Sequence, residues 1–287
     1  MAGPDRRKPA ERRTPPDRSV PSKLDVPTGA REPIGRDRAA KRRDAPPRAK
    51  RPDADTDGPP RPALPTDEQP DIPKGVRKEI ERVLGPRGSK AKDVCLALSV
   101  GSAAIEQDRP DVAVEVLGWA KHQAPRIATI REAYGVALYL QERFAAALTE
   151  LQAYRRLTDR VDQNHLIADC LRALGRDLDQ IAEAAEALVQ DTQAPEDRRA
   201  EAAIVWAAAV ADAGDLPAGR SIVRRFLERQ RSGDAEHDLR ARYLAADLAE
   251  RDGDDDELIR QLESIVAVDN GFLDADERLD GARERRR

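Results

Sequence analysis

The sequence predicts an all-α protein, a right-handed α-solenoid of about five helix–turn–helix units preceded by a long disordered tail. Three observations lead to this prediction. Apolar residues recur at three- and four-residue steps from residue 74 onwards, which is the period of an amphipathic helix. Turn residues interrupt this pattern at near-regular intervals. Residues 1–72, in contrast, contain 15 of the 21 prolines and no aromatic residue.

The tail, residues 1–72, contains only isolated apolar residues, which cannot bury enough surface to offset the entropy of ordering. Residues 1–52 carry 16 Lys/Arg against 7 Asp/Glu, a net charge of +9, and the rest carries 34 against 47, or −13. The block Arg36–Arg51 is basic, and Asp53–Asp71 is acidic and rich in proline. Such a tail is either a solubilising leader or a segment that binds nucleic acid or an acidic protein surface, the chain's own array included.

Residues 73–89 are predicted to form an N-terminal capping helix and a linker. The helix spans Lys74–Leu84, places Val76, Ile80 and Val83 on one face, and ends at Gly85–Pro86. Terminal units of stacked arrays are often atypical because they cover the exposed core.

Residues 90–270 form the repeat domain, with units at 90–125, 126–159, 161–195, 196–233 and 234–270. A small residue recurs in the first helix of each unit, at spacings of 34, 33, 39 and 39: Gly101, Gly135, Ala168, Ala207 and Ala246. A turn residue follows seven positions later each time: Asp108, Glu142, Gly175, Gly214 and Gly253. In the second unit, Gly135 and Ala147 are expected to be the closest contact between helices. Residues 271–287 are expected to form a C-terminal cap, with Phe272, Leu273 and Leu279 packing, and a frayed basic end.

This pattern resembles the tetratricopeptide repeat (TPR) family, whose unit is about 34 residues long. That family has a small residue in the first helix, a turn glycine seven positions later, an alanine in the second helix and a proline after it. The first unit matches at Gly101, Ala113 and Pro125, and the second at Gly135, Phe144 and Ala147. The later units depart from the alanine position, with Gln180, Gly219 and Leu258. The resemblance implies a helical solenoid that binds a segment of a partner protein and is not a catalyst.

In stacked helix pairs, the first helix of each unit lines the concave surface, which is an extended binding face. By register, the following residues are candidates for partner binding: Glu132, Val136, Tyr139, His165, Asp169, Arg172, Asp212, Arg240, Tyr243, Asp247 and Glu250. Acidic residues predominate, so a basic or Arg-rich segment is the expected ligand, stacked on Tyr139 and Tyr243. The alternative is that these are ordinary surface residues.

Catalytic signatures are absent from the sequence: there is no phosphate-binding loop, no nucleophile elbow and no zinc-protease motif. The three histidines lie in different units. The acidic run Asp252–Glu257 is interpreted as a turn followed by a negative first helical turn, rather than a calcium loop. Cys95 and Cys170 are expected to be buried, reduced thiols. The sequence therefore predicts no enzyme, no cofactor, no metal and no small-molecule substrate.

No apolar run approaches the roughly 18 residues of a membrane span, and the N-terminus lacks the apolar core of a secretory signal. We therefore expect a cytoplasmic protein, and the preference for Arg over Lys suggests a GC-rich bacterial source. The leading functional hypothesis is a non-catalytic interaction scaffold. The alternative is a nucleic-acid-associated protein anchored by its basic tail, with the array recruiting other proteins. The sequence does not identify the partner or the oligomeric state.

Overall fold

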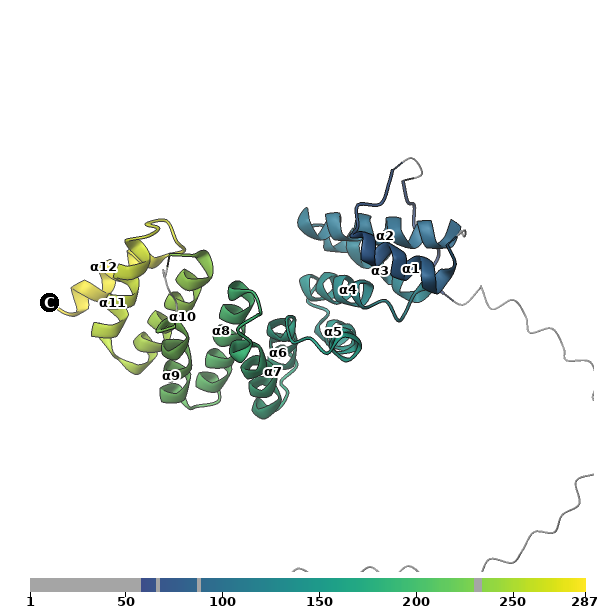
Figure 1. Ribbon diagram of the computed structural model, residues 1–287. Coiled ribbons are helices and arrows are strands. Elements are labelled where there is room, and N and C mark those ends of the chain that lie inside the picture. Colours follow the sequence, from purple (N-terminus) through teal and green to yellow (C-terminus); the bar gives the residue numbers. More distant parts are fainter. Residues whose placement is uncertain (1–57, 66–67, 87–88, 230–233) are drawn as a thin grey trace, which may run out of the picture. The chain divides into compact units, whose positions relative to one another are not determined.

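The computed structural model describes residues 58–65, 68–86, 89–229 and 234–287. These residues form twelve α-helices and contain no β-strand (Figure 1), which confirms the predicted all-α class. No helix in these ranges is both long and apolar enough to cross a membrane. The basic block Arg36–Arg51 lies outside the described residues, as does the rest of the tail up to residue 57.

The helices follow one another with short connections. Their bounds are α1 Lys74–Leu84, α2 Ser89–Glu106, α3 Pro110–Gln123, α4 Ala128–Leu140, α5 Phe144–Thr158, α6 Asn164–Ala173, α7 Leu178–Gln190, α8 Glu196–Asp212, α9 Leu216–Leu227, α10 Glu236–Asp252, α11 Asp255–Val266 and α12 Ala275–Arg285. The predicted capping helix coincides with α1.

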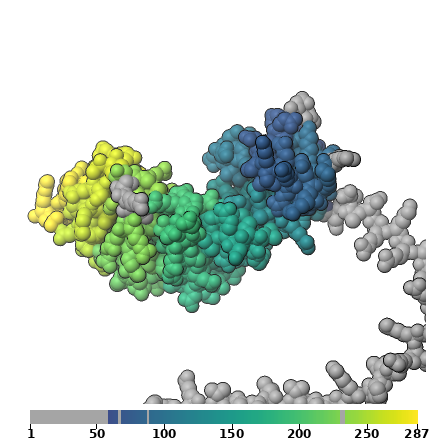
Figure 2. All heavy atoms as spheres, viewed as in Figure 1, coloured from purple at the N-terminus to yellow at the C-terminus, as the bar shows by residue number. Residues whose placement is uncertain are grey.

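Helices α2 to α11 form five pairs, α2 with α3, α4 with α5, α6 with α7, α8 with α9 and α10 with α11. The second helix of each pair packs on the first helix of the next, and first helices also touch, for example α6 on α8 and α8 on α10. Units that are adjacent in sequence are therefore adjacent in space, as the order of colours in Figure 2 shows. Buried apolar side chains continue through all five pairs, so no pair has a core of its own.

The turn inside each pair has the same backbone geometry. The five turn residues singled out by the sequence phase all have positive φ, from 53° at Asp108 and 57° at Glu142 to 99° at Gly214. In each turn the next residue donates its backbone N–H to a carbonyl five positions earlier, as Arg143 does to Leu138 at 2.9 Å. This is the bond of a Schellman motif, in which a left-handed residue ends the helix. Glycine adopts that conformation without a Cβ penalty, whereas Asp108 and Glu142 adopt it at a cost.

Small residues lie where the two helices of a pair approach most closely. A Cβ added to Gly101 would lie 2.4 Å from Cγ of Leu117, and one added to Gly135 would lie 2.8 Å from Cγ of Leu151. The neighbour of Gly135 is thus Leu151, sixteen residues later. Ala147, which the sequence suggested as the closest contact, is buried in a separate apolar cluster instead.

The fourth unit reverses this arrangement. Its first-helix residue Ala207 is fully buried, and Gly219 of α9 packs on it so closely that a Cβ would lie 2.7 Å from the Ala207 carbonyl oxygen. Gly219 occupies the position where the TPR family has alanine, so a departure from the family pattern here allows two backbones to approach.

The two cysteines are buried free thiols, Cys95 in α2 and Cys170 in α6. Burial raises the pKa of Cys170 to about 12, so its thiol stays protonated at neutral pH. Both side chains therefore act as small apolar core residues, as predicted.

A short N-terminal strap, residues 58–65 and 68–73, lies against the first unit. Arg61 donates two hydrogen bonds of 3.0 Å to the carboxylate of Asp93 on α2. Leu64 is buried in the same cluster as the side chains of α2, and the backbone N–H of Asp71 donates to Oγ of Ser99 at 2.9 Å. Residues that the sequence assigned to the end of the tail are thus part of the packed structure.

Helix α12 covers α11 at the C-terminal end, with Ala275, Leu279 and Ala282 buried between them. The helix continues to Arg285, through part of the stretch expected to fray. Arg283 forms an ion pair of 2.7 Å with Glu263 of α11.

Candidate functional site

An apolar pocket of about 460 Å³ lies between α8, α10 and the segment that leads into α12. Most of its lining is apolar, and three charged residues complete it: Ile204, Tyr243, Leu244, Phe272 and Leu273, with Glu236, Arg240 and Asp247. Its volume falls in the range of about 300–1,000 Å³ that is usual for ligand sites, and an apolar lining with few polar groups is also usual.

Tyr243 is held rigidly by contacts on several sides. Its ring meets Phe272 edge to face with 6.3 Å between centroids, and the guanidinium of Arg278 lies 4.9 Å from the ring centroid. Its hydroxyl donates a 2.5 Å hydrogen bond to Asp274. An aromatic side chain fixed in this way presents apolar surface without a further loss of conformational entropy on binding.

Leu273 lies at the rim of the pocket with 67% of its surface exposed, the largest fraction among the exposed large apolar residues of the described chain. Its backbone φ is 50°, a conformation that costs a non-glycine residue roughly 1–3 kcal/mol. The neighbours on either side, Phe272 and Asp274, are both tied to Tyr243, so the surrounding structure enforces this conformation. A strained residue that exposes apolar surface beside a pocket is an indication of function.

The charges at the rim are only partly neutralised. Arg240 forms an ion pair of 2.8 Å with Glu201 of α8, whose carboxyl pKa is raised by burial. Asp247 lies 3.9 Å from Arg278, which makes a closer pair of 2.6 Å with Glu250. Glu236 is exposed and has no ion pair within the described residues. The rim therefore presents two carboxylates, those of Glu236 and Asp247, to an approaching ligand.

Three predicted candidates, Arg240, Tyr243 and Asp247, line this pocket together. Glu250, one turn further along α10, contacts α12 instead, through Arg278 and through Arg285 at 2.9 Å. Asp212 pairs with Arg251 of the next unit at 3.0 Å and is not part of the lining.

Several candidates from α4 and α6 make polar contacts within the array and do not line this pocket. Glu132 accepts a 2.7 Å hydrogen bond from Gln163, and the hydroxyl of Tyr139 donates a 2.7 Å bond to Asp169. Asp169 also pairs with Arg172 at 2.6 Å. These contacts tie the second unit to the third, which gives the side chains a structural role that the sequence did not indicate.

Two further candidates from the same region are partly or largely enclosed. Val136 is half-buried on α4. Burial, and then the charge of Arg198, lower the pKa of His165 to about 4, so this imidazole is neutral at physiological pH. Its buried Nδ1 has no hydrogen-bond partner.

Sequence reasoning missed Ile204, Leu244 and Glu236, and it assigned Phe272 and Leu273 only to cap packing. The apolar residues carry the same periodicity as core residues, so the sequence does not distinguish them. No group of three or more His, Cys, Asp or Glu in the described part of the chain is placed to hold a metal ion. The acidic run Asp252–Glu257 forms a turn and the start of α11, with Gly253 in the left-handed region.

Five helix pairs share one turn geometry, a recurrent small residue at the helix contact, and unit-on-unit packing through a shared core. The described part of the chain therefore folds as a helical repeat of five TPR-like helix pairs. This architecture follows from its own helix pairs, and the first helices α2, α4, α6, α8 and α10 form one face of the TPR-like array.

No protein-family model matches the chain, and no curated protein matches it in sequence. Solved structures with a similar fold include a Pseudomonas aeruginosa pilF (16% identity, TM-score 0.49, covering 71% of this chain and 96% of that one). They also include YrrB, described as a TPR protein with an unusual peptide-binding site (13% identity, TM-score 0.48, covering 69% of this chain and 96% of that one). A third is described as a Podosopora anserina kinesin light chain with nearly identical TPR-like repeats (15% identity, TM-score 0.48, covering 60% of this chain and 92% of that one). Identity and TM-score are low in all three cases, so these structures add no argument about function.

Proposed function

We propose that the chain is a non-catalytic interaction scaffold that binds a segment of a partner protein in the pocket between α8, α10 and Phe272–Leu273. The ligand is a polypeptide segment with one large apolar side chain followed or preceded by a basic residue. The observation that carries this proposal is the combination of an apolar pocket, two rim carboxylates and an exposed leucine held in a strained conformation.

The apolar side chain of the ligand supplies most of the affinity. Burying a leucine- or phenylalanine-sized side chain contributes about 1.5–3 kcal/mol. Burial of Leu273 adds to the binding free energy, because a ligand in the pocket covers apolar surface of this residue that is otherwise in water.

The basic residue of the ligand fixes the orientation in which the segment binds. Arg240 is already paired with Glu201, so it does not repel a cation strongly, whereas Asp247 and Glu236 are accessible. A guanidinium or ammonium of the ligand forms a charge-assisted hydrogen bond with one of them. The guanidinium of Arg278 already lies over the ring of Tyr243, so the basic residue of the ligand pairs with the rim carboxylates rather than stacking on this ring.

Tyr139 is less suited to this role than the sequence suggested. Tyr139 does not line this pocket, whereas Tyr243 does, and the hydroxyl of Tyr139 bonds to Asp169 of the third unit. We therefore place the binding site at Tyr243 alone.

The test uses fluorescently labelled peptides that carry one Leu or Phe anchor flanked either by Arg or by Gln, titrated against the full chain. We expect Leu273→Asp to weaken binding by about tenfold or more, because it places a charge on the apolar rim, and Asp247→Asn to weaken binding of Arg-flanked peptides only. Leu157→Asp is the matched control, since Leu157 on α5 is also exposed, at 48%. Equal affinities for the two Leu→Asp variants would remove the pocket from consideration.

A second candidate function is association with nucleic acid through the basic block Arg36–Arg51, and the charge split of +9 against −13 favours it. Its affinity for generic duplex DNA would fall steeply with salt concentration. Replacing the eight Lys/Arg residues of that block with Gln in the full chain tests it. DNA binding that survives this replacement would contradict the role of the tail.

A further inference from the structure

Helix α9 differs from every other helix of the described chain in its charge. It carries Arg220, Arg224 and Arg225 and contains no Asp or Glu, whereas each of the other eleven has at least one acidic residue. The part of the chain after residue 52 is strongly acidic overall, with a net charge of −13. A local excess of arginine creates a positive potential that attracts anions.

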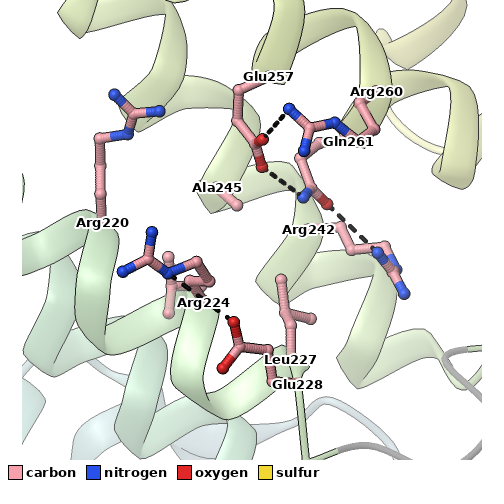
Figure 3. Close-up of a pocket in the computed structure, with 10 residues that line it drawn as sticks. Arg220, Arg224, Leu227, Glu228, Arg242, Ala245, Glu257, Arg260 and Gln261 are labelled. Atoms are coloured by element: carbon pink, nitrogen blue, oxygen red, sulfur yellow. Dashed lines mark hydrogen bonds and ion pairs between the residues drawn. The ribbon is translucent and has the colours of Figure 1, made fainter.

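A pocket of about 330 Å³ lies between α9, α10 and α11. Four arginines line it, Arg220, Arg224, Arg242 and Arg260, together with the carboxylates of Glu228 and Glu257. Figure 3 shows Arg220 and Arg224 on one side and Arg242, Arg260 and Gln261 on the other, with Ala245 between them. The arginines thus come from three helices of two neighbouring units.

Two of the four guanidinium groups are neutralised within the protein. Arg220 pairs with Asp252 and, at 2.5 Å, with Asp254, both on the turn between α10 and α11. Arg260 pairs with Glu257 at 2.5 Å, and Glu257 also accepts a 2.7 Å hydrogen bond from Gln261. Arg220, Arg260, Glu257 and Gln261 line the pocket, whereas Asp252 and Asp254, the partners of Arg220, do not.

The other two guanidinium groups lack a close acidic partner. Arg224 has its nearest carboxylate, Glu228, at 3.9 Å, beyond hydrogen-bond distance. Arg242 donates only to the neutral amide oxygen of Gln261, at 3.3 Å, and has no carboxylate within 4.0 Å among the described residues. Arg242 is also half-buried, so it is less able than an exposed arginine to complete its hydrogen bonds with water.

Arg242 has an acidic neighbour that it does not use. Asp238 lies one turn earlier on α10, and its buried Oδ1 atom has no hydrogen-bond partner. The guanidinium of Arg242 reaches the pocket wall at Gln261 rather than this oxygen. The side chain of Arg242 therefore points towards the pocket and not towards Asp238.

We propose that this pocket binds a multiply charged anion of the phosphate type, held by Arg224 and Arg242. The planar guanidinium group offers paired N–H donors that match the oxygens of a phosphate, and such bonds are among the strongest in proteins. The pocket is large enough for a phosphate ester on a side chain or a small molecule. The two pockets share α10, but no residue lines both of them.

The experiment is a calorimetric titration of the full chain with pyrophosphate at constant ionic strength. We expect Arg224→Gln and Arg242→Gln each to weaken binding by about tenfold or more, since each removes a charge-assisted pair. Arg225→Gln is the matched control, because Arg225 is adjacent on α9, is exposed and does not line the pocket; its binding should stay within about twofold of the wild type. Arg242→Lys keeps the charge but not the fork, and should give an intermediate loss.

Three results would overturn the proposal. These are no binding of pyrophosphate at millimolar concentration, equal binding by all variants, and an Arg225→Gln loss as large as that of Arg224→Gln. Equal binding would assign the anion to the basic block Arg36–Arg51 or to an adventitious site. Arg224 is exposed, so its replacement leaves folding intact and decides the question even if Arg242→Gln lowers stability. A parallel titration with a phosphoserine peptide separates the sources: tighter binding than pyrophosphate indicates a modified protein segment, and weaker binding a small molecule.

Discussion

The contact between Gly135 of α4 and Leu151 of α5 fixes the register of the second helix pair, and a double-mutant cycle tests it. A Cβ on residue 135 would lie 2.8 Å from both Cγ and Cδ2 of Leu151 and 3.3 Å from its backbone nitrogen. Ordinary carbon–carbon contacts are about 3.5–4.0 Å, so Leu151 would have to move by well over half an ångström. Leu151 is completely buried, and protein interiors are close-packed, so such a movement is costly.

The magnitudes follow from this geometry. In Gly135→Ala, replacing a glycine inside a helix stabilises the protein by about 1 kcal/mol. The overpacking against Leu151 destabilises it by about 1–3 kcal/mol, so we expect a net loss of roughly 1 kcal/mol. Leu151→Ala should lose about 2–5 kcal/mol through transfer and cavity terms. In the double variant the added methyl group occupies part of the cavity, and only its 3.3 Å contact with the backbone nitrogen of residue 151 remains tight. The two changes should therefore be non-additive, with a favourable coupling of about 1–3 kcal/mol.

The assay is chemical denaturation of the four proteins, followed by far-ultraviolet circular dichroism. Gly281→Ala on α12 is the control: the only neighbour of a Cβ there is the flexible side chain of Arg285 at 3.9 Å, so the change should stabilise the protein by roughly 1 kcal/mol. Additivity of Gly135→Ala and Leu151→Ala within about 0.5 kcal/mol would refute the assigned contact.

Three further predictions concern other parts of the array. Glu142→Gly should raise the free energy of unfolding by roughly 0.5–1 kcal/mol, because φ at this turn is 57°; an unchanged or lower denaturation midpoint would count against the shared turn geometry. Gly219→Ala should cost about 2 kcal/mol or more, since the obstacle is the Ala207 backbone carbonyl, which cannot rotate away; a wild-type melting temperature would contradict this. The pKa of the His165 imidazole is about 4 in the folded chain and 6.5 ordinarily. The contribution of this neutral side chain to the free energy of unfolding is therefore complete above pH 6.5 and is lost as the pH falls towards 4. The difference in stability between wild type and His165→Gln should shift by up to about 3 kcal/mol across that interval, and a constant difference would exclude a buried neutral imidazole.

The architecture was predictable because two local rules repeat along the chain. A left-handed turn residue and a small residue seven positions earlier are each required by backbone geometry, and both are visible at fixed phase. The non-glycine turn residues Asp108 and Glu142 occur at the same phase and also have positive φ.

The candidate site was predictable only in part. Register alone placed Arg240, Tyr243 and Asp247 on one face, and these three line a pocket. Register does not reveal which polar groups satisfy each other, so Tyr139 and Asp169 could not be recognised as partners across units.

The remaining features depend on contacts that the sequence does not encode locally. Leu273 is exposed because Phe272 and Asp274 on either side are both fixed by Tyr243, 29 to 31 positions earlier in the chain. The Arg pocket arises because α9 and α11, from different units, lie on either side of α10. Periodicity identifies the buried face of a helix but does not show which surface residues of neighbouring units meet.

Photo-crosslinking from residue 273 tests the binding role of the array most directly. A photoreactive phenylalanine analogue replaces Leu273 in one full-length protein and Leu157, the exposed control position on α5, in another, and both are mixed with an Arg-flanked, Leu- or Phe-anchored peptide. The account predicts a crosslinked product from residue 273 that excess unlabelled peptide competes away, and little or none from residue 157. Equal yields from the two positions, or no yield from residue 273, would contradict it.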